Sequence, residues 1–292
     1  MSRLSGERVP QTEVGAERDV HYIQRPACRS FELNQYNPLH WGGPMTLVLA
    51  LKAKDGIWIA ADKRETSYTA AMPTTDTASK IRLVARNCCI ALSGNSPVGL
   101  THLEEFERGS QCVEYDSLQD AGTIAHALYQ FTQQRLALLD KGAEESLREC
   151  AFLVVGYTKG TTGKWRPCIK RLDDHMGLGF YPGDCVVGSV VSDSDIGFGT
   201  LGRDGLVYYY QQVLGISFQD LTVDELQKIG LFILAETAAA TLDVGPIYDV
   251  FHMFEDSHSP IKDYSAALQA AKEAQEDVRE GLRGRLAPKP HN

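Results

Sequence analysis

Apolar residues in the first regular part of the chain follow the pattern of strands. Two apolar runs meet at Lys54-Asp55-Gly56, and Asp-Gly between apolar runs favours a tight hairpin turn. A second pair of apolar runs meets at Arg86-Asn87. The pattern therefore predicts four antiparallel strands: Thr46–Ala53, Ile57–Ala61, Ser79–Val84 and Cys88–Leu92.

Helical spacing of apolar residues follows these strands. Ser96-Pro97 resembles an N-cap followed by proline at the first helical position, which predicts a helix to about Arg108. Thr222 and Glu225 form a capping box before an apolar run. The other expected elements are helices over 117–139, 206–213, 226–242 and 263–283, and strands Ala151–Tyr157, Pro167–Leu172 and Pro246–Phe254.

The order of these elements is strands, helices, strands, helices and a strand. A doubly wound parallel sheet would alternate strictly between strand and helix, and this chain does not. The order predicts an α+β fold in which antiparallel sheets carry helices on their outer faces.

The chain divides into three parts by pattern. Residues 1–45 lack a sustained period and are expected to be an extension or a pro-segment. Residues 46–255 form the regular domain, and residues 256–292 form a polar helix and tail. No internal repeat is visible.

Composition narrows the class of protein. The chain has 292 residues, of which 43% are hydrophobic, and its net charge is −9. These values exclude a wholly disordered, collagen-like or coiled-coil chain, and they make nucleic acid or an anionic membrane an unexpected partner. No apolar stretch is long enough to span a membrane. Seven cysteines without a C-x-x-C motif, and no secretory signal, favour the reducing cytoplasm.

Three residues at the start of the domain form a candidate catalytic group. Thr46 opens the first strand, Asp62 closes the second strand of the same hairpin, and Lys80 opens the third. A threonine hydroxyl needs a base, and the residue's own α-amine serves when threonine is the first residue. A nearby lysine ammonium lowers the pKa of that amine and so favours its basic form.

The stretch TLVLALKAKDGIWIAADKRET, followed by ASKIRLV and IALSGNS, resembles the core of proteasome β-subunits. The bacterial peptidases HslV and Anbu share that core. The resemblance implies a four-layer αββα sandwich, the N-terminal-nucleophile hydrolase fold, and a ring-shaped oligomer. It implies Thr46 as the nucleophile and Lys80 as the group that tunes its amine. Asp62 would orient Lys80, and the Gly94 N–H would stabilise the oxyanion.

Later parts of the family pattern are less clear in this chain. The family has a serine that assists the nucleophile, and Ser189 is one candidate for it. Alternatively, the segment Gly202–Gly205 matches that part of the family pattern, and this segment contains no serine. The expected late aspartate falls near Thr241, and Asp243 is the nearest carboxylate. These two roles stay open.

The amine of Thr46 must be freed before it can act as a base. Either the segment 1–45 cleaves itself off after Met45, or translation begins at Met45 and an aminopeptidase removes that methionine. By either route the active chain is expected to begin at Thr46, and the intact mass of protein from the native host tests this expectation.

Four other features are expected to be structural. A glycine motif at Gly197–Gly202 lacks the strand-and-helix context of a dinucleotide site. His252 and His258 lack metal-ligand spacing. The remaining features are Cys88 and Cys89, expected to be buried hydrophobes, and Tyr208–Tyr210, expected to be packing residues.

The sequence thus predicts a threonine-type endopeptidase that needs no metal or cofactor. Its expected partners are unfolded polypeptides or peptides as substrates and further copies of the chain, with an ATP-dependent unfoldase as an open question. The alternatives are a catalytically inactive assembly subunit and an amidohydrolase that acts on a small amide. Cleavage specificity and ring size stay open.

Overall fold

A computed structural model describes residues 47–66, 73–172, 196–198, 215–240 and 244–286, all within the compact unit Gly42–Asn292. The helices are α1 (Ser96–Gly109), α2 (Ala121–Leu136), α3 (Lys141–Arg148), α5 (Val223–Ala240) and α6 (Ser265–Leu286), with a 3₁₀ turn at Phe218–Asp220. The strands are β1 (Val48–Lys52), β2 (Ile57–Asp62), β3 (Glu65–Thr66), β4 (Pro73–Thr75), β5 (Ile81–Ala85), β6 (Cys88–Ser93), β7 (Ala151–Lys159), β8 (Trp165–Leu172), β9 (Ile196–Phe198), β10 (Tyr248–Met253) and β11 (His258–Pro260).

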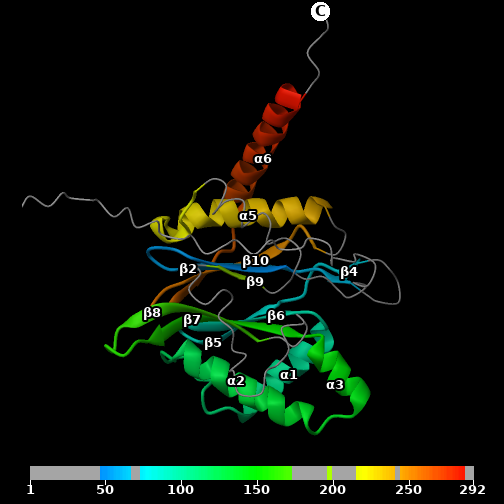
Figure 1. The fold of residues 1–292 in the computed structure, drawn as a ribbon, viewed down its shortest axis with the longest axis vertical. Coiled ribbons are helices and arrows are strands. Elements are labelled where there is room, and N and C mark those ends of the chain that lie inside the picture. The colour runs from blue at the N-terminus through cyan, green and yellow to red at the C-terminus, as the bar shows by residue number, and fades with distance from the viewer. Residues whose placement is uncertain (1–46, 67–72, 173–195, 199–214, 241–243, 287–292) are drawn as a thin grey trace, which may run out of the picture. The chain divides into compact units, whose positions relative to one another are not determined.

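These elements form four layers, as Figure 1 shows. One antiparallel sheet has the order β11-β10-β2-β1-β9, and the other has the order β5-β6-β7-β8. Helix α5 covers the first sheet, α6 packs against α5 and extends away from it, and α1, α2 and α3 cover the second sheet. The predicted αββα sandwich of the α+β class is therefore confirmed.

The strands of the first hairpin are apolar at almost every position because both faces of these strands are buried. Leu49 and Leu51 of β1 pack with Trp58 of β2 in the core beneath α5. Val48 and Ala50 point the other way, into the core between the two sheets. Because successive strand side chains alternate between faces, a strand buried on both faces reads as a continuous apolar run.

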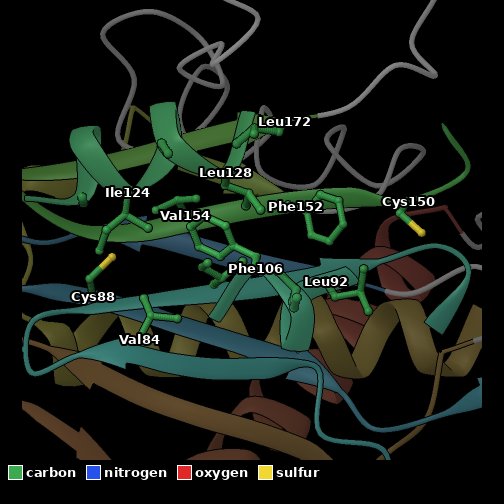
Figure 2. Packing of buried hydrophobic residues seen from close by; sticks show 14 of the residues in the cluster. Val84, Cys88, Leu92, Phe106, Ile124, Leu128, Cys150, Phe152, Val154 and Leu172 are labelled. Carbon is green, nitrogen blue, oxygen red and sulfur yellow. The ribbon is translucent and has the colours of Figure 1, made fainter. Parts of the chain in front are cut away.

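The second sheet has its own core beneath α1 and α2. Figure 2 shows Phe106 of α1 and Ile124 and Leu128 of α2 against Phe152 and Val154 of β7. All five side chains are buried. Burying such side chains contributes about 1.5–3 kcal/mol each, which fixes the helix layer on the strands that lead to the candidate site.

The starts of α1 and α2 differ from the prediction because of their capping residues. The N-cap of α1 is Asn95, whose side chain accepts a hydrogen bond from the Val98 N–H, so Ser96 is the first helical residue. The predicted helix over 117–139 begins at Ala121 after the cap Asp120. A separate helix, α3, follows with its own cap, Asp140. Aspartate and asparagine are both strong caps, and their side chains decide these starts.

Other predictions are confirmed or lie outside the described residues. The capping box before α5 is present, because Thr222 N–H and Oγ1 both bond the Glu225 carboxylate. The short strands β3, β4, β9 and β11 were not predicted, and the segment 206–213 lies outside the described residues. In the part of the chain that the structure describes, no helix has the length and apolar content needed to cross a membrane.

Candidate active site

Asp62 ends β2 with a carboxylate that is fully buried and receives several hydrogen bonds. Its Oδ1 accepts the Leu47 N–H at 2.7 Å. Its Oδ2 accepts the Arg64 N–H at 3.0 Å and, more weakly, the Gly245 N–H at 3.5 Å. Backbone donors from three separate segments therefore converge on one carboxyl group, which compensates for its removal from water.

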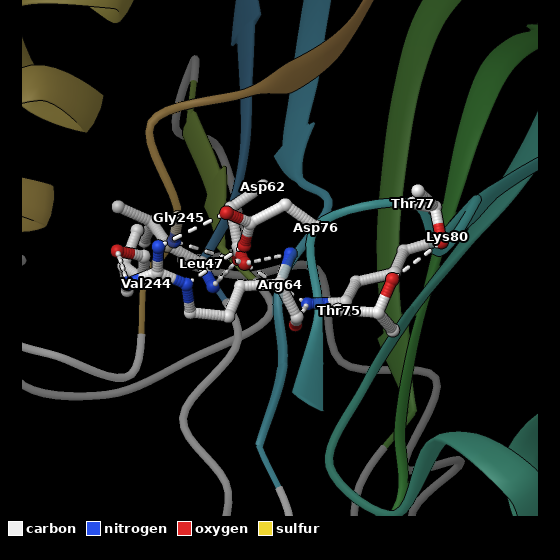
Figure 3. Close-up of polar contacts among 9 residues, drawn as sticks. All are labelled: Leu47, Asp62, Arg64, Thr75, Asp76, Thr77, Lys80, Val244 and Gly245. Carbon is white, nitrogen blue, oxygen red and sulfur yellow. Dashed lines mark hydrogen bonds and ion pairs between the residues drawn. The ribbon is translucent and has the colours of Figure 1, made fainter. Parts of the chain in front are cut away.

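Lys80 supplies the positive partner of this carboxylate. It directly precedes β5, is 1% exposed, and donates from Nζ to Asp62 Oδ2 at 3.0 Å. The same ammonium donates to the backbone carbonyl of Arg64 at 2.5 Å. Figure 3 shows the Lys80 side chain running from its own strand toward Asp62 and Arg64. The structure thus brings together the predicted Asp62 and Lys80, from the two different sheets.

Burial acts in opposite directions on the two groups. Removal from water raises the pKa of Asp62 above its usual value, and the attraction of Lys80 opposes this shift. Burial lowers the pKa of Lys80, and the attraction of Asp62 opposes that shift. Both shifts narrow the difference between the two pKa values, and shifted pKa values of this kind are typical of functional sites.

The first hairpin ties the residue after Thr46 to this pair. In addition to the Leu47 N–H bond, Asp62 N–H donates to the Leu47 carbonyl at 3.1 Å. Asp62 is thereby bonded on both its backbone and its side chain to Leu47. Thr46, which the peptide bond joins to Leu47, lies outside the described residues.

Gly94 follows β6 at the end that adjoins Lys80. The Leu92 N–H donates to the Lys80 carbonyl at 2.8 Å, so the end of β6 lies beside the start of β5. Gly94 has φ +98°, and a β-carbon there would lie 1.9 Å from the carbonyl oxygen of Glu149. Only glycine fits both the backbone conformation and the space at this point.

Sequence reasoning missed Arg64 and Gly245 as parts of this site. Arg64 stands two residues after Asp62 in the quoted motif, and that proximity was the available signal. Gly245 is 183 residues from Asp62 in the chain, so only the fold shows that its N–H reaches this carboxylate. The candidates Ser189 and Asp243, and the alternative segment Gly202–Gly205, lie outside the described residues.

The residues expected to be structural have structural roles where they are described. Gly197 lies within β9 and pairs with Ala50 of β1, so it is not a turn residue after a parallel strand. His252 Nε2 bonds the Gln227 side chain, and His258 Nδ1 bonds the Arg86 carbonyl.

The adjacent cysteines are also confirmed as core residues. Cys88 and Cys89 are fully buried. Burial raises the pKa of Cys89 to about 12, which keeps this thiol protonated at neutral pH. Among the described residues, no group of histidine, cysteine and carboxylate side chains is arranged to hold a metal ion. Tyr208–Tyr210 lie outside the described residues.

Comparison with known proteins supports the expected relationship. The family model described as "Proteasome subunit" matches residues 46–163. This stretch contains all four predicted site residues, Thr46, Asp62, Lys80 and Gly94. No curated protein matches the chain by sequence.

Solved structures extend the likeness over more of the chain. Anbu from Yersinia bercovieri has a TM-score of 0.60 at 15% identity, over 84% of this chain and 99% of that one. Anbu from Pseudomonas aeruginosa, solved as a helical assembly, has a TM-score of 0.60 at 14% identity, over 84% and 100%. Anbu from Hyphomicrobium sp. strain MC1 has 0.59 at 13%, over the same shares. At such identities these likenesses establish the fold alone.

Proposed function

We propose that this chain, which carries a proteasome-subunit domain over residues 46–163, is a threonine-type peptidase whose nucleophile is the hydroxyl of Thr46. The observation that supports the proposal is the buried Asp62–Lys80 pair and its bond to the Leu47 N–H. Thr46 directly precedes Leu47 in the chain, so an ammonium held at this pair would act on the α-amine of that threonine.

The reaction begins when the neutral α-amine of Thr46 takes the proton from the threonine hydroxyl. The oxygen attacks the peptide carbonyl, and the Gly94 N–H donates to the oxyanion that forms. The amine then gives the proton to the leaving nitrogen, which leaves an ester on Thr46. Water, activated by the same amine, hydrolyses the ester and restores the enzyme.

Lys80 and Asp62 act on this cycle through charge. The Lys80 ammonium favours the neutral form of the nearby Thr46 amine, because two adjacent positive charges repel. Asp62 keeps the ammonium in place at 3.0 Å. Neither side chain forms a covalent bond with the substrate.

Because the mechanism needs a free α-amine on Thr46, the first test is to identify the N-terminal residue of the active protein. Two forms of the chain are produced, one begun at Met1 and one begun at Met45, and their intact masses are measured. We expect the active form of each to begin at Thr46. A persistent Met1 N-terminus together with no hydrolysis would support the inactive assembly subunit instead.

Activity is tested with a set of fluorogenic peptides and a set of small amides. We expect peptide hydrolysis by the native chain and its loss in Thr46→Ala. The matched control is Thr101→Ala on the exposed side of α1, which should hydrolyse at the native rate. Turnover of small amides without peptide cleavage would instead identify an amidohydrolase.

We further propose that the active protein is a homo-oligomer in the cytoplasm. The helical assembly of the Pseudomonas aeruginosa Anbu supports the first part. The free cysteines among the described residues support the second. Light scattering should give a mass that is a multiple of the protomer, which is 32.2 kDa for the complete chain. A mass equal to one protomer would contradict the oligomer.

A further inference from the structure

A second ion pair lies beside Asp62 and Lys80, and the reaction described above does not use it. Arg64 Nε bonds Asp76 Oδ1 at 2.7 Å, and a second guanidinium nitrogen bonds Asp76 Oδ2 at 3.0 Å. The ion pair is bidentate, and two parallel hydrogen bonds fix the plane of the guanidinium as well as its position. Both side chains are only partly exposed, at 15% and 30%.

The backbone of Arg64 contacts both members of the buried pair. Its N–H donates to Asp62 Oδ2 at 3.0 Å, and its carbonyl accepts the Lys80 ammonium at 2.5 Å. The orientation of this one residue therefore determines where the ammonium lies between two oxygens. The N–H and the carbonyl belong to the two peptide groups on either side of the Arg64 α-carbon, so a displacement of this backbone would change both contacts together.

The side chain of Arg64 joins three segments that are far apart in the sequence. Asp76 follows β4, and a guanidinium nitrogen also donates to the Val244 carbonyl at 3.5 Å, ahead of β10. Gly245 packs between them, because a β-carbon there would lie 2.8 Å from Asp76 Oδ1 and 2.9 Å from Arg64 Cβ. Figure 3 shows these residues grouped around Asp62.

We propose that Arg64 and Asp76 are positioning residues for the reaction: their ion pair holds the Arg64 carbonyl against the Lys80 ammonium and so fixes the place of that ammonium beside Asp62. The contacts above support the positioning of Lys80. The expected effect of this positioning on the reaction rate rests on the proposed function. Neither Arg64 nor Asp76 is assigned a contact with substrate.

A neighbouring ion pair provides a matched control. Lys63, one residue earlier, bonds Asp249 at 3.1 Å, and its side chains are 24% and 19% exposed. This pair joins the end of β2 to β10 in a similar way. The hydrogen bonds of the Lys80 ammonium go to Asp62 and Arg64, and neither belongs to the Lys63–Asp249 pair.

The first measurement is structural and does not need activity. Crystal structures of Asp76→Ala and Asp249→Ala are compared with that of the native chain. In Asp76→Ala we expect the Lys80 Nζ to Arg64 O distance to lengthen beyond hydrogen-bonding reach. In Asp249→Ala we expect this distance to stay as in the native chain. An unchanged Lys80–Arg64 contact in Asp76→Ala would overturn the proposal.

The second measurement is kinetic. Misplacing a catalytic group by about 1 Å can cost about 100-fold in rate, so kcat for fluorogenic peptides should fall by about 10- to 100-fold in Asp76→Ala. KM should change by less than about 2-fold. Asp76→Glu, which keeps the charge, should recover part of the rate, and Asp249→Ala should keep the native kcat.

The pH profile separates positioning from a merely structural role. Asp62, Glu65 and Asp76 are the carboxylates that raise the pKa of Lys80, against the effect of its burial. Asp76→Ala removes one of them, so the alkaline limb of the kcat profile should move to lower pH. Equal losses of stability in Asp76→Ala and Asp249→Ala, with native kcat and pH profile in both, would overturn the proposal.

The two proposals fail in different ways. If the native chain hydrolyses no peptide, the proposed function fails, and the crystal structures still decide whether Asp76 positions Lys80. If the native chain is active and Asp76→Ala keeps its kcat, only the positioning role is wrong.

Discussion

Gly94 shows how one residue's backbone can carry a functional constraint. Its φ of +98° and the Glu149 carbonyl 1.9 Å from a would-be β-carbon exclude other residues. Gly94→Ala should lower the free energy of unfolding by at least about 2 kcal/mol, from backbone strain and the clash together. Peptide hydrolysis should fall as the N–H is displaced.

Urea unfolding measures this cost against a control. Gly109, at the end of α1, has no atom within 4 Å of its would-be β-carbon. Gly109→Ala should therefore change stability by less than about 0.5 kcal/mol. Equal stability of the two variants would contradict the strain at Gly94.

His102 predicts a loss of stability in acid. It is buried among Phe131 and Phe152, its Nε2 pairs with Thr132 Oγ1 at 2.9 Å, and burial lowers its pKa to about 4. The unfolded chain binds a proton at this residue below about pH 6.5, and the folded chain does so only near pH 4. The stability that this residue contributes is therefore present above pH 6.5 and is lost as the pH falls toward 4.

The loss from pH 7.5 to pH 5 should be about 2 kcal/mol for this one residue. Urea unfolding at both pH values measures it in the native chain and in His102→Gln, which has no group that titrates in this range. The native chain should lose more stability than the variant. Equal losses in the two proteins would show that other groups cause the acid sensitivity.

Sequence reasoning found the chemistry of the site better than its surroundings. Asp62 and Lys80 could be predicted together because residue type and spacing encode them locally. Arg64 and Gly245 contact the buried pair through backbone atoms, which every residue possesses, so residue type gives no signal for those contacts. Asp76 could be assigned a partner only once the fold had placed Arg64 beside it.

Helix α5 illustrates the same limit for whole elements. Its existence and its capping box followed from the sequence, but its close approach to β2 did not. Gly230 faces Trp58, and a β-carbon at Gly230 would lie 2.1 Å from the indole ring. The glycine looks unfavourable in a helix by propensity alone, and packing on Trp58 explains its presence.

Gly230→Ala should therefore destabilise the protein, although alanine is the better helix former. We expect a loss of about 1–3 kcal/mol in the free energy of unfolding, because the helix must move away from the sheet. The control is Gly142→Ala in α3, where the nearest atom lies at an ordinary 3.6 Å. That variant should gain up to about 1 kcal/mol. A stable Gly230→Ala would contradict the close contact.

The elements that the sequence missed share a physical reason. Strands β3, β4, β9 and β11 have two or three residues each, too few to show an alternating pattern. The predicted helix over 117–139 ends three residues beyond α2, because Ala137, Leu138 and Leu139 favour a helix. Helix α3 was not predicted, and its signal in the sequence is the Asp140 cap.

At the scale of the whole molecule, the Asp62–Lys80 pair is a charged link between the two sheets. Lys80→Met should lower the free energy of unfolding by about 3–5 kcal/mol, because it leaves the Asp62 charge buried without its partner. The double variant Asp62→Asn with Lys80→Met should be more stable than Lys80→Met alone. A double-mutant cycle from urea unfolding tests this, and additive losses would contradict the coupling.

The pairing of β10 with β2 also affects when the site can form during synthesis of the chain. Gly245 and the strand after it complete the surroundings of Asp62, yet Gly245 is 183 residues further along the chain. A ribosome that adds about 5–20 residues per second needs about 10–40 s to make that stretch. The hairpin that holds Asp62 therefore emerges well before the strand that encloses it. During that interval Asp62 and Lys80 are already made but lack Gly245 and β10, and chemistry that depends on the enclosed pair waits until that strand has been added.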